Sequence, residues 1–520
     1  MAPLLLGLDC GLSATKAVLF GVDGEEQGKA VVKTTHSSPR PHWVERDMDV
    51  FWLDCTRAIS AAIEDAGANA KDIVCVGLTG HGDGVYLVDE QYRPVRPAIV
   101  SLDSRAVDIV EHWRSMGIVS DLLRVTGQRP WPGSPAALLA WLKVNEPEPL
   151  GRARFLLSCK DWVKLRLTDR VSTDPTEANP SFCDVTTQTY SVEALRLFGL
   201  ETSEPLLPGV IESCGVAGEV TMQAAAQTGL SPGTPVVSGL HDTDACAVAN
   251  GCIEPGRLMI IAGTFSINET VSRHPVVDPR WSCRNFIAKG RWMNSARSPA
   301  STTNLDWFVR EILREPSFHS IDEEVAAAVA SPRDVWFTPF LYGSPLGDDT
   351  SAGFVGLRGW HRRADMLRAL FEGVVFNHKM HVDALTSVFS ISDAWLTGGG
   401  SRSQVWCQMF ADALGMPVSV SASGEAGALG AAACAGVGVG LFPTIESGID
   451  RMLHVAATYE PTSAGEASLR DGYEKYRELI RALGPFWTEV SHGRRGADEP
   501  SDISSSVAPA ARASEAPKPW

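Results

Sequence analysis

The residues best suited to chemistry near the start of this sequence lie in a turn between two apolar runs. Apolar runs of this length around a Gly-containing turn predict a hairpin of buried strands. The amides of a tight turn bind anions, Lys16 could add positive charge, and Asp9 could hold Mg²⁺ directly or through water. The turn therefore suits a phosphate with its metal, through Asp9, Gly11, Ser13, Thr15 and Lys16. An ordinary hairpin with solvated turn residues is the alternative for this stretch taken alone.

The same pattern recurs about 250 residues further along the chain. From Leu258 an apolar run leads through a turn that contains Gly263 and Thr264, and a second predicted strand follows. Two similar units so far apart predict two related domains, each offering a phosphate loop to a shared cleft.

An aspartate at the start of a predicted helix is the candidate base. Residues 235–239 predict a strand that ends in glycine, and Asp242 lies in the first turn of the Ala-rich helix that follows. A carboxylate at this place could accept the proton of a substrate hydroxyl. It could instead cap the helix, and the sequence leaves both roles open.

Polar side chains also follow two predicted buried strands, at residues 73–78 and 98–102. His81 and Asp83 follow the first strand among glycines that let a ligand approach the backbone, and Asp103 follows the second. Trp131, in a Pro-rich loop, could form an apolar wall for a sugar ring. A core histidine, a turn-closing aspartate and a core tryptophan are the alternatives. The polar segment 173–179 is expected to be a loop near the substrate.

A glycine run at residues 398–400 separates a predicted strand from a long predicted helix that ends at Leu414. Such a run lets a planar or phosphorylated ligand lie on the helix N-terminus. His378 and His381 stand three residues apart on another predicted helix and could form a metal pair, although no third ligand is near in the sequence.

The composition is that of a globular protein of two or three domains, with 520 residues, 44% of them apolar and 21% charged. A net charge of -16 argues against nucleic acid and anionic membranes as partners. Eleven scattered cysteines without a C-x-x-C pair indicate reduced thiols of a cytoplasmic protein. The small-residue run 427–442 predicts a packed helix, because it is too short to span a bilayer. Residues 490–520 lose periodicity and predict a disordered tail.

Taken in order, these stretches resemble the FGGY carbohydrate kinases. The resemblance is carried by residues 9–16, 80–84, 103–105, 239–242, 263–264, 352–357 with 372–373, 397–418 and 425–432. It implies an α/β protein with two ribonuclease-H-like domains, of the actin and hexokinase type, around a catalytic cleft. Residues 1–245 would form the sugar- and phosphate-binding domain and residues 246–489 the adenosine-binding domain. Leu12 departs from the family pattern, which has a small hydroxylic residue there.

Within the family, residues 43–48, 131–135, 340–344 and 372–378 resemble the L-xylulose kinase branch, with erythritol kinases next. The resemblance implies ATP- and Mg²⁺-dependent phosphorylation of a small sugar or polyol, with a ketopentose such as L-xylulose as the expected substrate. It implies that Asp242 is the base and shares the metal with Asp9. Phosphate binding falls to Gly11, Ser13, Thr15, Lys16, Gly263 and Thr264, adenosine binding to Gly399, Gly400 and Ser403, and substrate binding to His81, Asp83, Asp103 and Trp131.

Three alternatives stay open beside this kinase. They are an erythritol or other polyol kinase, a pseudokinase that binds sugar and nucleotide without turnover, and a chaperone-like or filament-forming ATPase of the same architecture. A homodimer is also compatible with the sequence.

Overall fold

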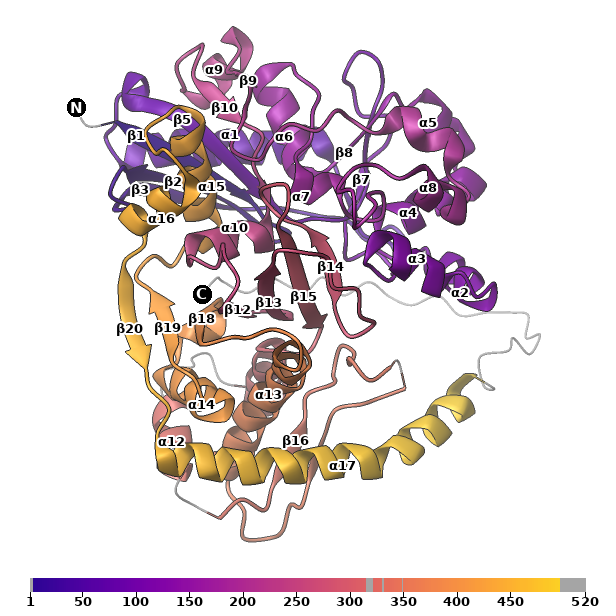
Figure 1. The fold of residues 1–520 in the computed structure, drawn as a ribbon, viewed down its shortest axis with the longest axis vertical. Coiled ribbons are helices and arrows are strands. Elements are labelled where there is room, and N and C mark those ends of the chain that lie inside the picture. Colours follow the sequence, from indigo (N-terminus) through magenta and orange to yellow (C-terminus); the bar gives the residue numbers. More distant parts are fainter. Residues whose placement is uncertain (1–2, 315–320, 330–331, 348, 496–520) are drawn as a thin grey trace.

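The computed structural model describes residues 3–314, 321–329, 332–347 and 349–495. Two seven-stranded sheets, one from each half of the chain, organise these residues (Figure 1). The first has the order β3-β2-β1-β5-β10-β9, with β11 paired to β5. Its strands are β1 Leu4–Cys10, β2 Ala14–Gly21, β3 Glu26–Lys33, β5 Ile73–Gly80, β9 Val216–Glu219, β10 Pro235–Val237 and β11 Leu240–His241.

The second sheet has the order β14-β15-β13-β12-β18-β19-β20. Each sheet contains an antiparallel hairpin whose first strand also pairs with a parallel strand, β1 with β5 and β12 with β18. The repeated hairpin and the two α/β units predicted from the sequence are therefore confirmed. The strands are β12 Arg257–Ala262, β13 Ser266–Ser272, β14 Ser282–Asn285, β15 Trp292–Ser298, β18 Asp393–Thr397, β19 Val418–Ser421 and β20 Val455–Tyr459.

Helices cover both faces of the first sheet because its strands alternate two apolar faces. On β1, Leu6 and Leu8 pack in the core that contains helix α1 (Met48–Asp65), whereas Leu5 packs in the core that contains α15 (Ala426–Gly438). Asp47 begins α1 by accepting hydrogen bonds from two backbone amides of the first turn. In the second sheet, Leu258 and Ile260 face the core that holds α13 (Arg363–Thr386) and α14 (Gln404–Leu414).

The remaining elements extend these two units (Figure 1). Beside the first sheet lie α2 Val107–Ser115, α3 Val119–Thr126, α4 Pro135–Asn145, α5 Pro147–Arg152, α6 Cys159–Thr168, α8 Val192–Phe198 and α9 Met222–Thr228, with the short strands β4 Glu45–Arg46, β6 Tyr86–Val88, β7 Ala98–Ile99 and β8 Phe155–Leu157. Around the second lie α11 Thr303–Trp307, α12 Ile321–Ala328, α17 Ser463–Arg495, β16 Trp336–Thr338 and β17 Gly353–Val355, whereas α16 Ile445–Met452 packs on α15 (Ala426–Gly438).

Two small-residue helices fill the layer between the sheets, α10 (Asp242–Ala249) and α15. Glycines let their backbones approach closely. A Cβ at Gly77 of β5 would lie 1.9 Å from the Ala431 carbonyl oxygen, and one at Gly430 would lie 2.1 Å from the Ala245 oxygen. Although α15 falls within the predicted residues 246–489, it packs on β1 and β5 of the first sheet. The small-residue helix predicted from residue 427 is confirmed.

Several local predictions were wrong in detail. The predicted loop 173–179 contains a short helix, α7 (Pro175–Ala178), because the Asp174 carboxylate accepts the Thr176 amide and begins it. The predicted helix after residue 398 is a 3₁₀ turn, Gly399–Arg402, followed by α14. The helix α17 continues to Arg495, past the start of the tail predicted from residue 490, and residues 496–520 lie outside the described part of the chain.

The two histidines considered as a metal pair are hydrogen-bonded to side chains of the second sheet and the segment after it. His378 bonds to Asn268 and Ser301, and His381 bonds to Ser298. Within the described ranges, no cluster of three or more His, Cys, Asp or Glu side chains is arranged to hold a metal.

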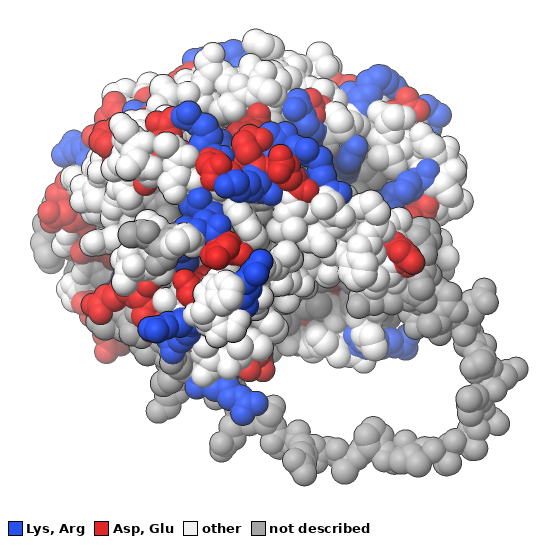
Figure 2. All heavy atoms as spheres, turned by 90° about the horizontal axis from the view of Figure 1, so that it is seen from below, with Lys and Arg blue, Asp and Glu red and all other residues white. Residues whose placement is uncertain are grey.

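Two surface observations bear on the expected partners. None of the helices that the structure describes combines the length and the apolar character needed to cross a membrane. On the face seen in Figure 2, acidic and basic side chains are interspersed rather than gathered by sign. A nucleic-acid-binding face would need a basic patch, which this face does not present.

The close approach of α15 and the first sheet gives a stability prediction. Gly77→Ala places a methyl group against the Ala431 carbonyl, so we expect it to destabilise the protein by about 1–3 kcal/mol and to lower the midpoint of thermal unfolding. Gly151→Ala, where nothing lies within 4 Å of the added Cβ, is the control and should change stability by less than about 0.5 kcal/mol. Equal midpoints for the two variants in differential scanning fluorimetry would contradict this packing.

Candidate active site

A cavity of about 410 Å³ lies between the two halves of the chain, and both contribute to its lining. The first half supplies strand ends, a loop and the start of α10, with His81, Gly82, Asp83, Trp131, His241 and Asp242. The second half supplies the β13 and β15 side, with Phe265, Ile267, Trp281, Ser295 and Arg297. Four of the predicted side chains, His81, Asp83, Trp131 and Asp242, thus meet at one cavity, and all four come from the first half of the chain.

Asp242 is the first residue of α10, immediately after the strand that pairs with β5. The N-cap of α10 is His241, so Asp242 does not occupy the capping position considered for it, although its Oδ1 accepts the Thr243 amide at 2.7 Å. The same Oδ1 lies 3.0 Å from His241 Nδ1, and 36% of the Asp242 side chain is exposed. A reactive oxygen is therefore accessible from the cavity.

The electrostatic surroundings of Asp242 favour its ionised form. Burial acts to raise the pKa of the carboxyl, but the charge and hydrogen bond of His241, with further contributions from His81 and the Thr243 amide, lower it overall. For His241 the balance is reversed. Burial and Arg284 lower its pKa, while Asp242 and Glu177 raise it to about 9. The pair therefore consists of an imidazolium beside a carboxylate.

His81 and Asp83 follow β5, as the sequence predicted, and both are buried. His81 Nε2 contacts the Tyr86 hydroxyl at 3.0 Å and Arg46 Nη1 at 3.3 Å, and burial lowers the pKa of the imidazole to about 3. Asp83 has a left-handed backbone at φ 60°, between Gly82 and Gly84. A Cβ at Gly82 would lie 1.9 Å from His241 Nε2, so only glycine lets this turn approach the His241 imidazole.

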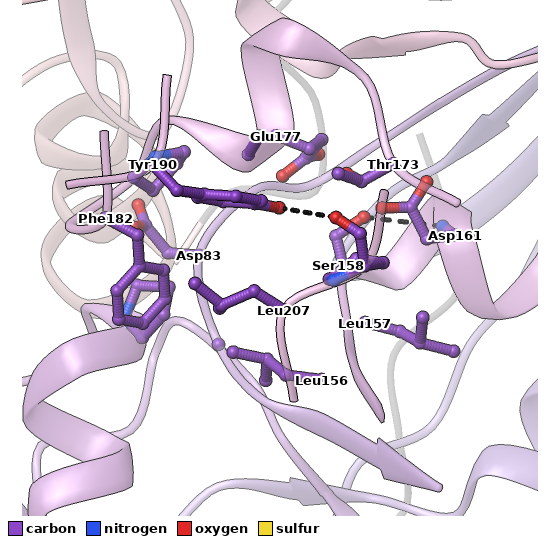
Figure 3. Close-up of a pocket in the computed structure, with 15 residues that line it drawn as sticks. Asp83, Leu156, Leu157, Ser158, Asp161, Thr173, Glu177, Phe182, Tyr190 and Leu207 are labelled. Carbon is purple, nitrogen blue, oxygen red and sulfur yellow. Dashed lines mark hydrogen bonds between the residues drawn. The ribbon is translucent and has the colours of Figure 1, made fainter. Parts of the chain in front are cut away.

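Asp83 also borders a second, smaller cavity of about 30 Å³, which is room for roughly two water molecules. Figure 3 shows that Glu177 and Tyr190 lie around the same space, and the Tyr190 hydroxyl donates to the Pro208 carbonyl. Burial raises the pKa of the Asp83 carboxyl, and the cations Arg297, His241 and Arg284 offset only part of that rise. Among the described residues no group hydrogen-bonds to this carboxylate, so a partner would come from one of the two cavities that it borders.

The first phosphate turn is formed as a hairpin, but its side chains are used differently from the prediction. The Thr15 side chain is fully buried, with its hydroxyl 3.9 Å from Cys55 Sγ, because alternation turns it toward the core. Lys16 Nζ is paired with Glu425, at the start of α15, at 2.8 Å. The Gly11 amide donates to Ala14 and closes the turn. Ser13 is exposed, and Leu12 lines the cavity.

Asp9 lies beside this turn and beside the start of α15, where a Cβ at Gly427 would be 2.9 Å from its Oδ2. Burial raises the pKa of its carboxyl to about 7, with Asp242 and Glu425 adding to the rise and Lys16 opposing it. A cation would relieve this repulsion, and oxygen donors from carboxylates suit Mg²⁺. The donor set thus fits Mg²⁺ that keeps water and phosphate oxygens as its other ligands.

The second turn predicted to bind phosphate, at Gly263 and Thr264, lies against the glycine run 398–400. A Cβ at Gly398, which has φ 88°, would approach the Ala262 carbonyl oxygen to 2.8 Å, and one at Gly400 would approach Ala262 Cβ to 2.8 Å. Gly399 has open space around it. Thr302 donates to the Gly263 carbonyl and holds that turn, and Thr264 follows it. The segments predicted for phosphate and adenosine are therefore neighbours, as one nucleotide requires.

Ser403 and Asp103 have structural partners. Ser403 accepts the Trp406 amide as the N-cap of α14 and donates to Asp322 at 2.8 Å. Asp103 is fully paired with Arg105 at 2.7 Å and accepts the Val44 amide at 2.6 Å, outside the lining of the cavity. The structure does not bring the Asp103 carboxylate to the substrate side.

The sequence analysis missed the arginines and one tryptophan of the cavity, which are Arg129, Arg280, Trp281 and Arg297. Arg129 stands two residues before Trp131. The loop that was predicted to contribute Trp131 could therefore also have been expected to bring Arg129 to the cavity. Arg297 is in a strand with Ser295 on the same face, a polar alternation that could have marked a cavity wall.

Comparison with known proteins decides the family. The N-terminal domain model of the FGGY family of carbohydrate kinases matches residues 4–249, and its C-terminal domain model matches residues 258–439. The chain belongs to the FGGY family. It is accordingly an enzyme that transfers phosphate to a carbohydrate hydroxyl, with ATP as the donor that the family implies. The gap between the two matches lies a few residues beyond the division predicted after residue 245.

Relatives of this kinase cover nearly its whole length. It is 33% identical to the L-xylulose/3-keto-L-gulonate kinase of Escherichia coli K12, over 94% of this chain and 99% of that protein. It is 28% identical to the erythritol kinase of Brucella abortus, over 94% and 98%. The crystal structure of xylulose kinase from Rhodospirillum rubrum superposes with a TM-score of 0.85 at 26% identity, over 93% of this chain and 100% of that one.

The position of Asp83 generates a prediction about selectivity. Asp83→Ala removes a buried carboxylate for which the described residues supply no hydrogen bond, so a substrate hydroxyl is its expected partner and KM for the true substrate should rise strongly, by roughly 10- to 100-fold. The preference over a deoxy analogue should shrink, and the Kd of ATP should stay nearly unchanged. Steady-state kinetics with both substrates and a nucleotide titration measure these quantities. Unchanged discrimination with lower thermal stability would make Asp83 a turn residue only.

Proposed function

We propose that this FGGY kinase transfers the γ-phosphate of ATP, with Mg²⁺, to a hydroxyl of a ketopentose such as L-xylulose, with Asp242 as the base. The supporting observation is the partly exposed Asp242 carboxylate, whose pKa is lowered by His241, in a cavity that also contains His81, Asp83 and Trp131. Similarity to an L-xylulose/3-keto-L-gulonate kinase over 94% of the chain supports the choice of sugar.

The chemistry proposed for these residues needs alignment and charge balance more than covalent catalysis. A sugar hydroxyl near Asp242 Oδ2 would pass its proton to that carboxylate as the oxygen attacks the γ-phosphate. His241 would hold the carboxylate in place through Oδ1 and keep it ionised until then. Asp9 and Asp242 would hold Mg²⁺, which when bound neutralises charge on the transferring phosphoryl group.

The nucleotide would lie between the two hairpin turns. The turn at Gly263 and Thr264 would hold phosphates, and the neighbouring glycine run at residues 398–400 would take the adenosine. In the first hairpin, the contribution proposed is that of the backbone around Gly11 and Ser13. Lys16 would act indirectly, since Glu425 already holds its ammonium group.

A charge-neutral substitution tests the base. Asp242→Asn should keep the fold and nucleotide binding but lower kcat by roughly 10²- to 10⁴-fold, because the amide cannot accept the hydroxyl proton. ADP release is measured with L-xylulose, D-xylulose, erythritol and hexuloses. Asp108→Asn, on the exposed side of α2, is the matched control and should leave kcat unchanged. Near-normal turnover in Asp242→Asn would assign the residue to the helix start alone.

The same screen separates the alternatives. Turnover of erythritol in preference to ketopentoses would identify a polyol kinase, and binding without turnover of any acceptor would identify a pseudokinase. ATP hydrolysis that needs no acceptor would instead indicate a chaperone-like or filament-forming ATPase.

Closure of the cavity is a second expected property, because the lining comes from both halves of the chain. Small-angle scattering should show a smaller radius of gyration when the substrate sugar and a nonhydrolysable ATP analogue are both present. The analogue with a sugar that the enzyme does not phosphorylate is the control and should give less compaction. An unchanged radius with the complete pair would count against closure.

A further inference from the structure

Three arginines contribute to the lining of the central cavity, Arg129, Arg280 and Arg297. A neutral sugar needs hydroxyl, amide and carboxylate groups rather than several guanidinium groups. Binding of a neutral sugar therefore does not explain the three positive charges in the cavity lining.

Arg280 is already neutralised. Its Nε and Nη2 donate to the two carboxylate oxygens of Asp278 at 2.9 and 2.8 Å, a bidentate pair. Among the residues that the structure describes, neither Arg129 nor Arg297 has a hydrogen bond or ion pair through its guanidinium group. Arg297 is thus free to bind an anion, and so is Arg129, although Arg129 is exposed and lies near enough to Asp278 to lower the pKa of that carboxyl.

Arg297 is fixed on the cavity side by the geometry of its strand. In the ladder of β15 with β13, Arg297 stands opposite Ile267, and both line the cavity together with Ser295. The next residue, Ser298, also borders the cavity, but its hydroxyl bonds to the buried His381. Arg297 shares its face of the strand with Ser295, so alternation places its side chain at the cavity.

Arg297 is partly buried, so its lack of a hydrogen-bonding or ionic partner among the described residues carries a free-energy cost. A guanidinium group that loses water without gaining an acceptor is destabilising. Asp83 is not the acceptor for the Arg297 guanidinium group. It is near enough for Arg297 to lower its pKa, yet the two groups form no ion pair within 4 Å, and burial still raises that pKa overall. The cavity thus presents positive charge that a ligand would satisfy.

We propose that Arg297, supported by Arg129, forms a carboxylate subsite in the substrate cavity, so that the enzyme binds sugar acids more tightly than neutral sugars of the same length. This inference rests on the proposed function, because it assigns a class of phosphate acceptor to the same cavity. A planar guanidinium group matches a carboxylate through two parallel hydrogen bonds. A neutral ketopentose still fits, since it reaches Asp83 and Asp242 and leaves the subsite to water.

The other anion that could reach Arg297 is the phosphoryl group in transfer. The position of Arg129 favours a substrate carboxylate over the phosphoryl group as the anion bound here. Arg129 belongs to the loop of Trp131, which is predicted to contact the sugar. That loop is separate from both hairpin turns and from the glycine run.

Matched ligands that differ only at one terminal carbon test the subsite. D-Gluconate is compared with D-glucitol, and D-xylonate with xylitol, without nucleotide. Binding is followed through the fluorescence of Trp131 and Trp281, which line the cavity. The wild-type protein should bind each acid roughly 10- to 100-fold more tightly than its alditol, the usual size of a charge-assisted pair.

Substitutions of the arginines test which side chain causes the tighter binding of the acids. Arg297→Gln should bring the ratio of the two Kd values close to one, and Arg129→Gln should lower it less. Arg297→Lys keeps the charge without the planar fork and should retain an intermediate ratio. Arg451→Gln removes an equal charge from the exposed side of α16, outside the cavity lining, and should leave the ratio unchanged.

Each contrary result has a distinct meaning. Turnover of ketopentoses by a wild-type protein that binds acid and alditol equally overturns the subsite and leaves the kinase proposal intact. A fall in kcat for neutral sugars in Arg297→Gln, with the binding ratio unchanged, assigns Arg297 to the phosphoryl group and also overturns the subsite. Turnover of no sugar, polyol or acid overturns the proposed function, and the inference with it.

Discussion

The contact of α15 with the first sheet is the constraint on which the rest of this structure depends. Gly7 and Gly77 lie against backbone carbonyls of α15, and Gly430 of the helix lies against α10. Because these contacts join backbones, a side chain at any of the three positions would push the helix away. The helix comes from the second half of the chain, so its seating on the first sheet places the two halves around one cavity.

Several features of the site follow from this seating. The start of α15 brings Gly427 against the Asp9 carboxylate and Glu425 against Lys16. Helix α15 also packs on α10, the helix that begins with Asp242. Arg284 of the second sheet holds α10 by donating to Asp244 at 2.9 Å and to the Thr243 hydroxyl. Buried ion pairs contribute little net stability, but they disfavour other arrangements of the charges they join. This one fixes the helix that carries Asp242, the proposed base.

Local sequence patterns were sufficient to predict most of the framework. Apolar runs around glycine turns located both hairpins, and the polar residues after β5 and β10 located His81, Asp83 and the helix that begins at Asp242. These elements were predictable because strand alternation, glycine turns and the start of a helix are set by neighbouring residues. The order of family-like segments then supplied the arrangement of two domains.

The sequence did not predict what depends on distant contacts. Lys16 meets Glu425, Asp103 accepts the Val44 amide, and Thr15 turns its hydroxyl toward Cys55. None of these partners is near in sequence, so no local pattern distinguishes a free side chain from a paired one. The free arginines were missed for the same reason, since their significance comes from the absence of a partner in the described structure.

The left-handed backbone of Asp83 restricts how this cavity can change in evolution. At φ 60° an aspartate, asparagine or glycine is tolerated, whereas a β-branched or bulky residue would add backbone strain. The adjacent Gly82 is equally restricted by the imidazole of His241. New acceptor preferences would therefore arise more readily by exchange of residues on the β15 wall and in the tryptophan loop. The end of β5 would stay nearly constant while the opposite wall diverged.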